Sequence, residues 1–148
     1  ENVSSANLSK FVKKGKMDIL SEINTAIDLC KKIQLKANDI SALPSSLSGG
    51  NQQKVVFAKL LNCDLKVLIL DEPTKGIDVG AKYSIYEIMN ELTQKGYAII
   101  MVSSEMPEVL GMSDRIVVMR SGRVMGEFGV DEVTQEKLLS VSLKEGGI

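Results

Sequence analysis

The segment that most constrains the fold is an uninterrupted apolar run, Val67-Leu68-Ile69-Leu70, which ends in Asp71-Glu72-Pro73. A strand with one face in water alternates apolar and polar residues, whereas a strand covered on both faces is continuously apolar. The run therefore predicts a strand buried on both faces of a parallel α/β sheet. Ligands of such sheets bind beyond the carboxyl ends of the strands, which is where the two acidic residues lie.

The rest of the chain shows alternating helix and strand patterns. Asp78 is expected to be the N-cap of one helix and Gly96 the residue just after its end. Arg120-Ser121-Gly122, between two apolar runs, indicates a β-hairpin. Helices are expected over residues 17–36, from Gly49 onward, and over 79–95, 106–111 and 134–142, and strands over 67–70, 97–102, 115–119 and 123–128.

This order of elements favours an α/β fold, with a mostly parallel sheet, covering helices and an antiparallel hairpin near the C-terminus. Residues 1–16 are polar and are interpreted as a solvated lead-in, and residues 37–46 as a loop. The first 46 residues are therefore expected to form a helical appendage to the sheet.

Composition excludes several classes of function. The 148 residues carry a net charge of −1, so no basic surface points to nucleic acid. No apolar stretch approaches the roughly 20 residues of a membrane span. The two cysteines, Cys30 and Cys63, are far apart in sequence and suggest reduced thiols. The chain has no histidine, which removes the commonest general base and the usual zinc ligand.

Two local motifs carry chemistry. The pair Asp71-Glu72 cannot be buried fully ionised without compensation, and a divalent cation such as Mg²⁺ relieves that cost. The alternative is a surface turn before Pro73. In the second motif, Leu47-Ser48-Gly49-Gly50-Asn51-Gln52-Gln53-Lys54, Ser48 is expected to cap a helix whose first amides bind phosphate. The alternative there is a glycine-rich turn ahead of a capped helix.

Together, these motifs and Gly76-Ile77-Asp78 resemble the ATP-binding-cassette (ABC) ATPases, which belong to the P-loop NTPases. Residues 47–51 match the signature motif, 67–72 the Walker B strand and 75–78 the D-loop. More narrowly, the sequence is similar to the ATPases of bacterial monosaccharide importers, which carry two cassettes in one polypeptide. The segments 76–82 and 103–105 resemble the second of these cassettes.

The resemblance implies a role for each matched residue. Asp71 is expected to hold Mg²⁺ through water, and Glu72 to be the general base for the attacking water. Ser48, Gly49 and Gly50, within a nucleotide-binding segment of Leu47 to Gln52, are expected to contact the γ-phosphate of ATP. Asn51 stands where the signature more often has Gln, and asparagine at this position resembles the sugar-importer subgroup. Asp78 is expected at the interface between cassettes.

Two departures limit what the chain is expected to do. The sequence lacks the phosphate loop Gly-x-x-x-x-Gly-Lys-Ser/Thr, so the isolated chain is expected to be inactive. The switch position, usually His in this family, is Ser104. Its hydroxyl can hydrogen-bond the γ-phosphate but carries no positive charge. The alternative for Ser104 is a capping serine before Met106-Pro107.

The sequence therefore predicts a fragment of the ATP-hydrolysing subunit of a monosaccharide importer. Residues 1–46 are expected to be part of the helical subdomain, and 47–148 the C-terminal part of the ATPase core. The implied partners are another cassette, transmembrane permease subunits and, indirectly, a sugar-binding protein, but not nucleic acid, and the implied location is the cytoplasmic face of the membrane. The alternatives are an importer ATPase for nucleosides or a signalling molecule, and a non-hydrolysing docking or regulatory cassette. A chromosome-maintenance ATPase head, a third hypothesis, needs long heptad arms that this sequence lacks.

Overall fold

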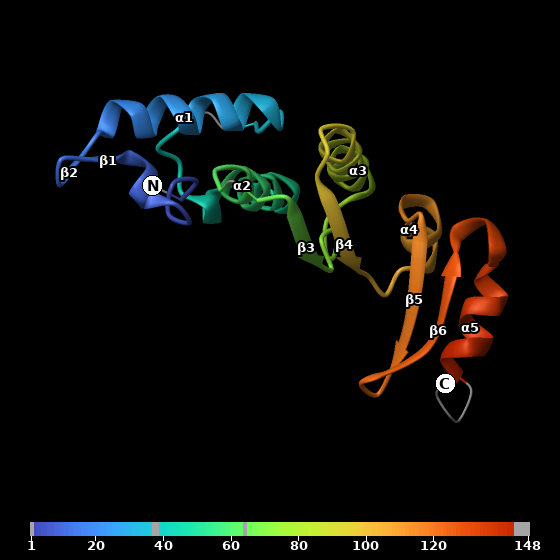
Figure 1. Cartoon of the computed structure of the whole chain (residues 1–148). Coiled ribbons are helices and arrows are strands. Elements are labelled where there is room, and N and C mark those ends of the chain that lie inside the picture. Colours follow the sequence, from blue (N-terminus) through green and yellow to red (C-terminus); the bar gives the residue numbers. More distant parts are fainter. Residues whose placement is uncertain (1, 37–38, 64, 144–148) are drawn as a thin grey trace. The chain divides into compact units, whose positions relative to one another are not determined.

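The computed structural model describes residues 2–36, 39–63 and 65–143. The chain divides into two compact units, Glu1–Val102 and Ser103–Ile148. Within the described residues, the strands form three two-stranded sheets, and each sheet lies inside one unit (Figure 1).

The N-terminal residues are mostly exposed, as expected of a solvated lead-in, but they fold into short elements that were not predicted. A 3₁₀ helix, Leu8–Phe11, leads into a small antiparallel hairpin of β1 (Val12–Lys13) and β2 (Lys16–Met17). The side chains of Val3 and Phe11 are buried, as is Ser4. Val3 and Phe11 belong to no long apolar run, so only tertiary contact reveals that they belong to the core.

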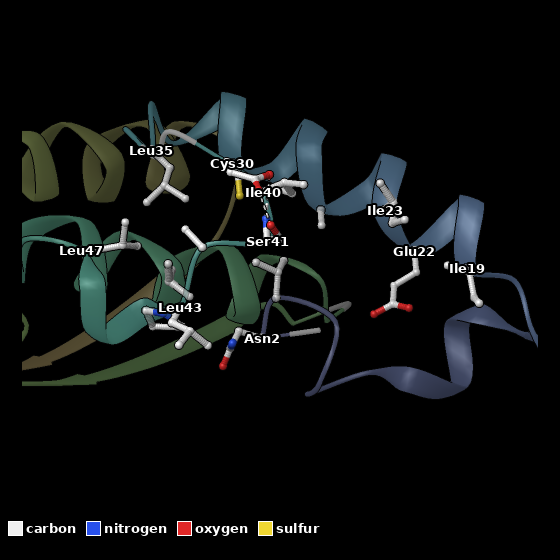
Figure 2. A pocket seen from close by; sticks show the side chains of 16 residues that line it. Asn2, Ile19, Glu22, Ile23, Cys30, Leu35, Ile40, Ser41, Leu43 and Leu47 are labelled. Carbon is white, nitrogen blue, oxygen red and sulfur yellow. Dashed lines mark hydrogen bonds between the residues drawn. The ribbon is translucent and has the colours of Figure 1, made fainter.

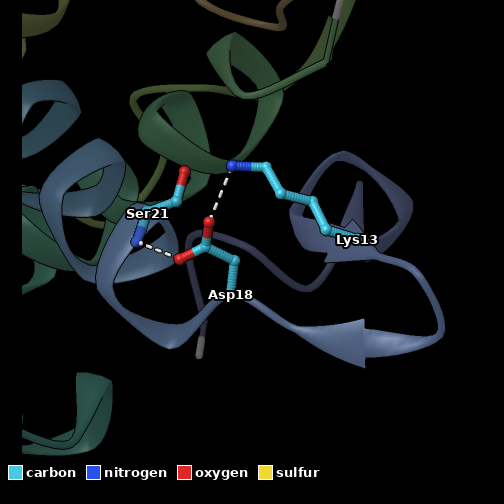
Figure 3. Close-up of polar contacts among 3 residues, drawn as sticks. All are labelled: Lys13, Asp18 and Ser21. Carbon is cyan, nitrogen blue, oxygen red and sulfur yellow. Dashed lines mark hydrogen bonds and ion pairs between the residues drawn. The ribbon is translucent and has the colours of Figure 1, made fainter.

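Helix α1 spans Ile19–Lys32 and is shorter than the predicted segment 17–36. At its start the Asp18 carboxylate accepts a hydrogen bond from the Ser21 amide at 3.1 Å and pairs with Lys13 Nζ at 2.8 Å (Figure 3). The Lys13 contact, followed by the Ser21 amide, lowers the pKa of Asp18. At the other end Gln34 adopts a left-handed conformation with φ of 52°, which ends the helix.

Helix α2, Gly49–Leu61, confirms the second predicted helix and contacts both α1 and α3 (Figure 1). Phe57 and Ala58 on α2 are almost fully buried and belong to the core of this unit. The preceding segment 39–43 is irregular, and Pro44–Ser46 form a short 3₁₀ helix within the region predicted as a loop. Residues 37–38 of that region lie outside the described residues.

Strands β3 (Val67–Asp71) and β4 (Ala98–Val102) form a parallel pair, joined by helix α3 (Val79–Gln94). Asp78 caps α3 through its bond from the Ala81 amide, and Gly96 follows its end with φ of 88°, as predicted. The α3 side chains Ile85, Ile88, Met89 and Leu92 are buried at helical spacing. This strand–helix–strand unit confirms the α/β class.

The expectation that the Val67–Leu70 strand is buried on both faces was wrong for this chain. Leu68 and Leu70 are buried, but Ile69 is 70% exposed. Its register partner Ile100 is 54% exposed on the same face of the sheet. The continuous apolar sequence is therefore covered on one side only, because no described element of this unit packs on the other.

The second unit confirms the C-terminal hairpin. It contains helix α4 (Met106–Met112), the antiparallel strands β5 (Arg115–Arg120) and β6 (Arg123–Gly129), a 3₁₀ turn Val130–Glu132 and helix α5 (Gln135–Leu143). Ser121 and Gly122, both with positive φ, form the two-residue turn. Helix α5 packs on the hairpin and buries Leu138 and Val141 (Figure 1).

Candidate functional site

The two acidic residues predicted for chemistry lie at the carboxyl end of β3, as expected. Asp71 is the last residue of the strand and is exposed. Glu72 is half-buried and has a left-handed backbone, with φ of 48°. Its amide donates to the Val102 carbonyl at 2.8 Å, and its carbonyl accepts from the Lys75 amide at 3.1 Å. A non-glycine residue in this conformation is strained, and such strain is concentrated at functional sites.

The donor set at this strand end suits Mg²⁺ only as part of a larger site. Among the described residues, no group of three or more Asp, Glu, Cys or His side chains gathers to hold a metal ion. Mg²⁺ commonly takes one or two carboxylates together with phosphate oxygens and water. Asp71 and Glu72 therefore fit a magnesium ion brought with a phosphate ligand, rather than one held by protein alone.

The turn before α2 is organised by its own side chains. Ser48 occupies the N-cap position, but its hydroxyl makes no capping bond, so the predicted capping role was wrong. Instead, Asn51 Nδ2 donates to Ser48 Oγ at 3.0 Å, while Asn51 Oδ1 accepts from the Lys36 amide at 3.0 Å. Gln52 Nε2 donates to the Leu47 carbonyl at 2.9 Å. The exposed Ser48 hydroxyl is thus fixed by a neighbour one helical turn away.

The two glycines of this turn differ in their surroundings. Gly50 is buried, and a Cβ added there would lie 2.5 Å from the Ala81 Cβ of α3. A Cβ on the exposed Gly49 would lie 3.2 Å from Ile77 Cγ2. Gly50 therefore permits close packing of α2 on α3, whereas Gly49 leaves the outer side of the turn open.

These contacts bring two of the predicted site segments together. The signature turn, residues 47–52, packs directly on the segment 76–81 that contains Asp78. Asp78 is exposed, and one of its carboxylate oxygens accepts the Ala81 amide at 2.9 Å. The signature turn and the D-loop thus form one continuous surface in this unit.

Ser104 lies in the other unit, two residues after the end of β4. It is exposed, and its alternative interpretation as a helix cap was wrong because Glu105 occupies the N-cap position of α4. The neighbouring Ser103 hydroxyl instead accepts the Glu105 amide at 3.0 Å and hydrogen-bonds the buried Glu108 carboxylate. Ser103 and Glu108 thus hold the start of α4, and Ser104 is left facing solvent.

A groove of about 460 Å³ lies beside the signature turn, between α1 and residues 39–47 (Figure 2). Its lining is mainly apolar and includes Ile23, Cys30 and Leu43. Burial raises the pKa of the Cys30 thiol, which agrees with its interpretation as a buried small apolar residue. Of the predicted site residues, only Leu47 lines this groove.

One residue near the signature turn was missed at the sequence level. Lys54 on α2 is 8% exposed, and its Nζ donates to the Gln34 carbonyl at 3.2 Å. Burial, followed by the nearby Lys36 charge, lowers the pKa of Lys54, whereas Glu87 opposes that shift. Its position three residues after Asn51 places both side chains on one face of α2, but nothing in the sequence identifies Gln34 as the acceptor.

Comparison with known proteins agrees with the family resemblance of these motifs. A family model described as ABC transporter matches residues 3–75. The ribose import ATP-binding protein RbsA of Bacillus subtilis is 52% identical over 142 residues, which cover 96% of this chain and 29% of that protein. The chain belongs to the ABC transporter family. The xylose import ATP-binding protein XylG of Geobacillus kaustophilus is also 52% identical, over 95% of this ABC chain and 28% of its own length.

Solved ABC cassettes share the fold. The cassette MJ1267 aligns with 96% of this chain and 62% of its own length, with a TM-score of 0.73 and 21% identity. The cassette MJ0796, in a structure bound to ADP and Pi, aligns with 87% of this chain and 56% of its own length, with a TM-score of 0.71 and 22% identity. This ABC chain thus spans less than a third of its curated relatives and about three-fifths of a single cassette. Within its described residues, no helix is both long and apolar enough to cross a bilayer.

Proposed function

We propose that this chain is part of the second cassette of an ATP-hydrolysing subunit in a monosaccharide importer, where ATP binding and hydrolysis drive sugar uptake. The observation that carries the proposal is the packing of the signature turn on the segment of Asp78, which follows the acidic end of β3 in the sequence. The 52% identity to ribose and xylose import ATP-binding proteins supports the substrate class.

The geometry of the first unit supports the proposed roles of the signature turn. Ser48, Gly49 and Gly50 contact the γ-phosphate of a nucleotide held by an opposing cassette. The exposed Ser48 hydroxyl and the first amides of α2 are the donors for it. Leu47, Asn51 and Gln52 shape this turn through their own hydrogen bonds. Phosphoryl transfer depends mostly on positioning and charge stabilisation, which such fixed donors supply.

Glu72 is proposed as the general base, which orients the attacking water and takes its proton. Its strained backbone, held by the bond to the Val102 carbonyl, fixes the direction in which the side chain leaves the strand. Asp71 is proposed to hold Mg²⁺ through water, and the ion, when bound, neutralises charge on the phosphates. Asp78 contacts the opposing cassette, and Ser104 donates a hydrogen bond to the γ-phosphate.

The proposed assembly includes a first cassette in the same or a second polypeptide, transmembrane permease subunits and, indirectly, a periplasmic or extracellular sugar-binding protein. It lies on the cytoplasmic face of the membrane, with residues 1–46 as part of the helical subdomain that faces the permease and 47–148 as ATPase core. The exposed apolar face of β3 and β4 supports a larger domain, since strands of parallel sheets are normally covered on both faces.

A chimera tests the proposal. The matching 142 residues of the Bacillus subtilis ribose import protein are replaced by this chain, and ATP hydrolysis and ribose uptake are measured in cells that lack the native protein. We expect the chimera to support both, and Glu72→Gln to lower hydrolysis at least 100-fold while nucleotide binding remains. A chimera that binds ATP but hydrolyses it no faster than its Glu72→Gln form would favour the regulatory alternative. ATP hydrolysis without ribose uptake would favour the alternative of an importer ATPase for a nucleoside or signalling molecule.

The isolated chain gives a second test. Because its sequence lacks a phosphate loop, we expect no micromolar binding of MgATP by calorimetry. Micromolar binding would contradict the proposal that the nucleotide is held mainly by other residues.

A further inference from the structure

Two side chains of α2 reach to the segment that follows α1. Asn51 Oδ1 accepts the Lys36 amide at 3.0 Å, and Lys54 Nζ donates to the Gln34 carbonyl at 3.2 Å. Asn51 and Lys54 are three residues apart and so lie on one face of the helix. Their partners, Gln34 and Lys36, have one residue between them, so residues 34–36 are held at two points.

The segment that they hold has a strained backbone. The Gln34 amide donates to the Lys31 carbonyl at 3.0 Å, and the Leu35 amide to the Cys30 carbonyl at 2.9 Å. This is the Schellman pattern, in which the residue after the helix end is usually glycine. Helix α3 ends in the same pattern with Gly96, whereas α1 uses Gln34 with φ of 52°. A non-glycine residue there needs support from its surroundings, because the left-handed conformation is unfavourable for it.

Burying the Lys54 ammonium group costs desolvation free energy, and lysine is seldom buried in folded proteins. Lys54 is 8% exposed, and its partner among the described residues is a backbone carbonyl rather than a carboxylate. Exchanging Lys54 for an apolar residue of equal length removes this desolvation but also the bond to Gln34. The geometry is therefore suited to holding the end of α1 in place rather than to general stability.

Asn51 also connects this contact to the signature turn. Its Nδ2 donates to Ser48 Oγ at 3.0 Å, so one amide side chain bridges the Lys36 amide and the Ser48 hydroxyl. We propose that Asn51 and Lys54 are positioning residues that fix the orientation of the Ser48 hydroxyl relative to the C-terminal end of α1. This inference rests on the proposed contact between Ser48 and the nucleotide. The strength of the contact between Ser48 and the nucleotide then depends on residues 34–36.

The link itself is tested without nucleotide, in the full chain. Hydrogen exchange at the Lys36 amide, followed by NMR, reports the bond to Asn51. We expect Asn51→Ala to speed this exchange about tenfold and Lys54→Met to speed it less. Lys59→Met, which changes an exposed lysine of the same helix, is the matched control and leaves it unchanged. Unchanged exchange in Asn51→Ala, with helix content intact by circular dichroism, would overturn the link.

The consequence for the nucleotide is tested by ATP hydrolysis in the ribose import chimera. We expect Asn51→Ala and Lys54→Met to raise KM for ATP about two- to tenfold, the range of one lost hydrogen bond, with kcat changed less. Lys54→Arg keeps a hydrogen-bond donor at this position, so we expect its KM for ATP to stay close to that of the parent chimera. If Asn51 acts through Ser48, the double variant Ser48→Ala/Asn51→Ala has the KM of Ser48→Ala alone.

The outcomes separate this inference from the proposed function. If Ser48→Ala leaves KM unchanged, the proposed nucleotide contact of Ser48 is wrong, whatever the exchange data show. If Ser48→Ala raises KM but Asn51→Ala does not, or if the two effects multiply independently, the positioning role of Asn51 is wrong and the contact of Ser48 stands.

Discussion

Replacing Gly50 with alanine tests how closely α2 packs on α3. The new Cβ would lie 2.5 Å from the Ala81 Cβ and 3.6 Å from the Ala81 Cα. Carbon atoms in contact are normally about 3.5–4.0 Å apart, so the two helices must separate by about 1 Å. Overpacking of this kind costs about 1–3 kcal/mol, and alanine returns up to about 1 kcal/mol through its better helix propensity. We expect Gly50→Ala to lower the free energy of unfolding by about 1–2 kcal/mol.

The assay is urea unfolding of the full chain, followed by circular dichroism at 222 nm, with a double-mutant cycle. Ala81→Gly removes the opposing methyl group, and the Cβ at position 50 then meets the Ala81 Cα at an ordinary distance of 3.6 Å. The double variant should therefore lose less stability than the sum of the single changes, by about 1–2 kcal/mol. Gly49→Ala, whose Cβ would lie 3.2 Å from Ile77 Cγ2 and 3.9 Å from the Gly76 carbonyl oxygen, is the control and should change stability little.

Two results would refute this reasoning. Gly50→Ala as stable as the parent chain would mean that α2 and α3 adjust freely at this contact. A cycle in which the single effects simply add would mean that Gly50 is sensitive for a reason other than Ala81.

Three further predictions follow from other contacts. The pKa of Asp18 is lowered in the folded chain, so the charged carboxylate stabilises the fold fully above the usual pKa of aspartate. This stabilisation is lost as pH falls through the lowered pKa of the folded chain. Asp18→Asn should thus lower Tm at pH 6, and this loss should shrink as pH falls below the usual pKa of aspartate; a loss that does not change with pH would contradict the role of charge. Cys63, only half-buried, should react with a thiol reagent at pH 8 at least tenfold faster than Cys30, whose pKa is raised by burial; Cys63→Ala then leaves only slow labelling. The exposed apolar face around Ile69 should make the chain self-associate, and Ile69→Lys should lower the molecular mass measured by light scattering. A parent chain that is monomeric at high concentration would contradict this prediction.

The sequence predicted most of the fold because its signals are local. The caps at Asp78 and Gly96, the turn at Ser121-Gly122 and the helical spacing of α3 depend on residues close together in the chain. The Asp71-Glu72 pair at the strand end was predicted for the same reason, since the apolar run before it defines where the strand stops.

The sequence could not predict features that depend on distant contacts. The burial of Val3 and Phe11 follows from packing rather than from any local pattern. The end of α1 at Gln34 was not predicted, because glutamine gives no signal for a left-handed residue. The Ser48 hydroxyl was expected to cap α2, but Asn51, itself bonded to the Lys36 amide, binds it instead.

The sequence by itself determined the class of fold, the order of the helices and strands from α1 to α5, and the motifs that resemble an ABC ATPase, since each of these depends on a short stretch of chain. Only the tertiary structure decided which motif residues meet. It placed Gly50 against Ala81, joined Asn51 and Lys54 to the end of α1, and left one face of the β3–β4 sheet uncovered. The physical reason is that these outcomes depend on how closely separate elements approach, which is set by packing across the core and not by the residues of any one segment.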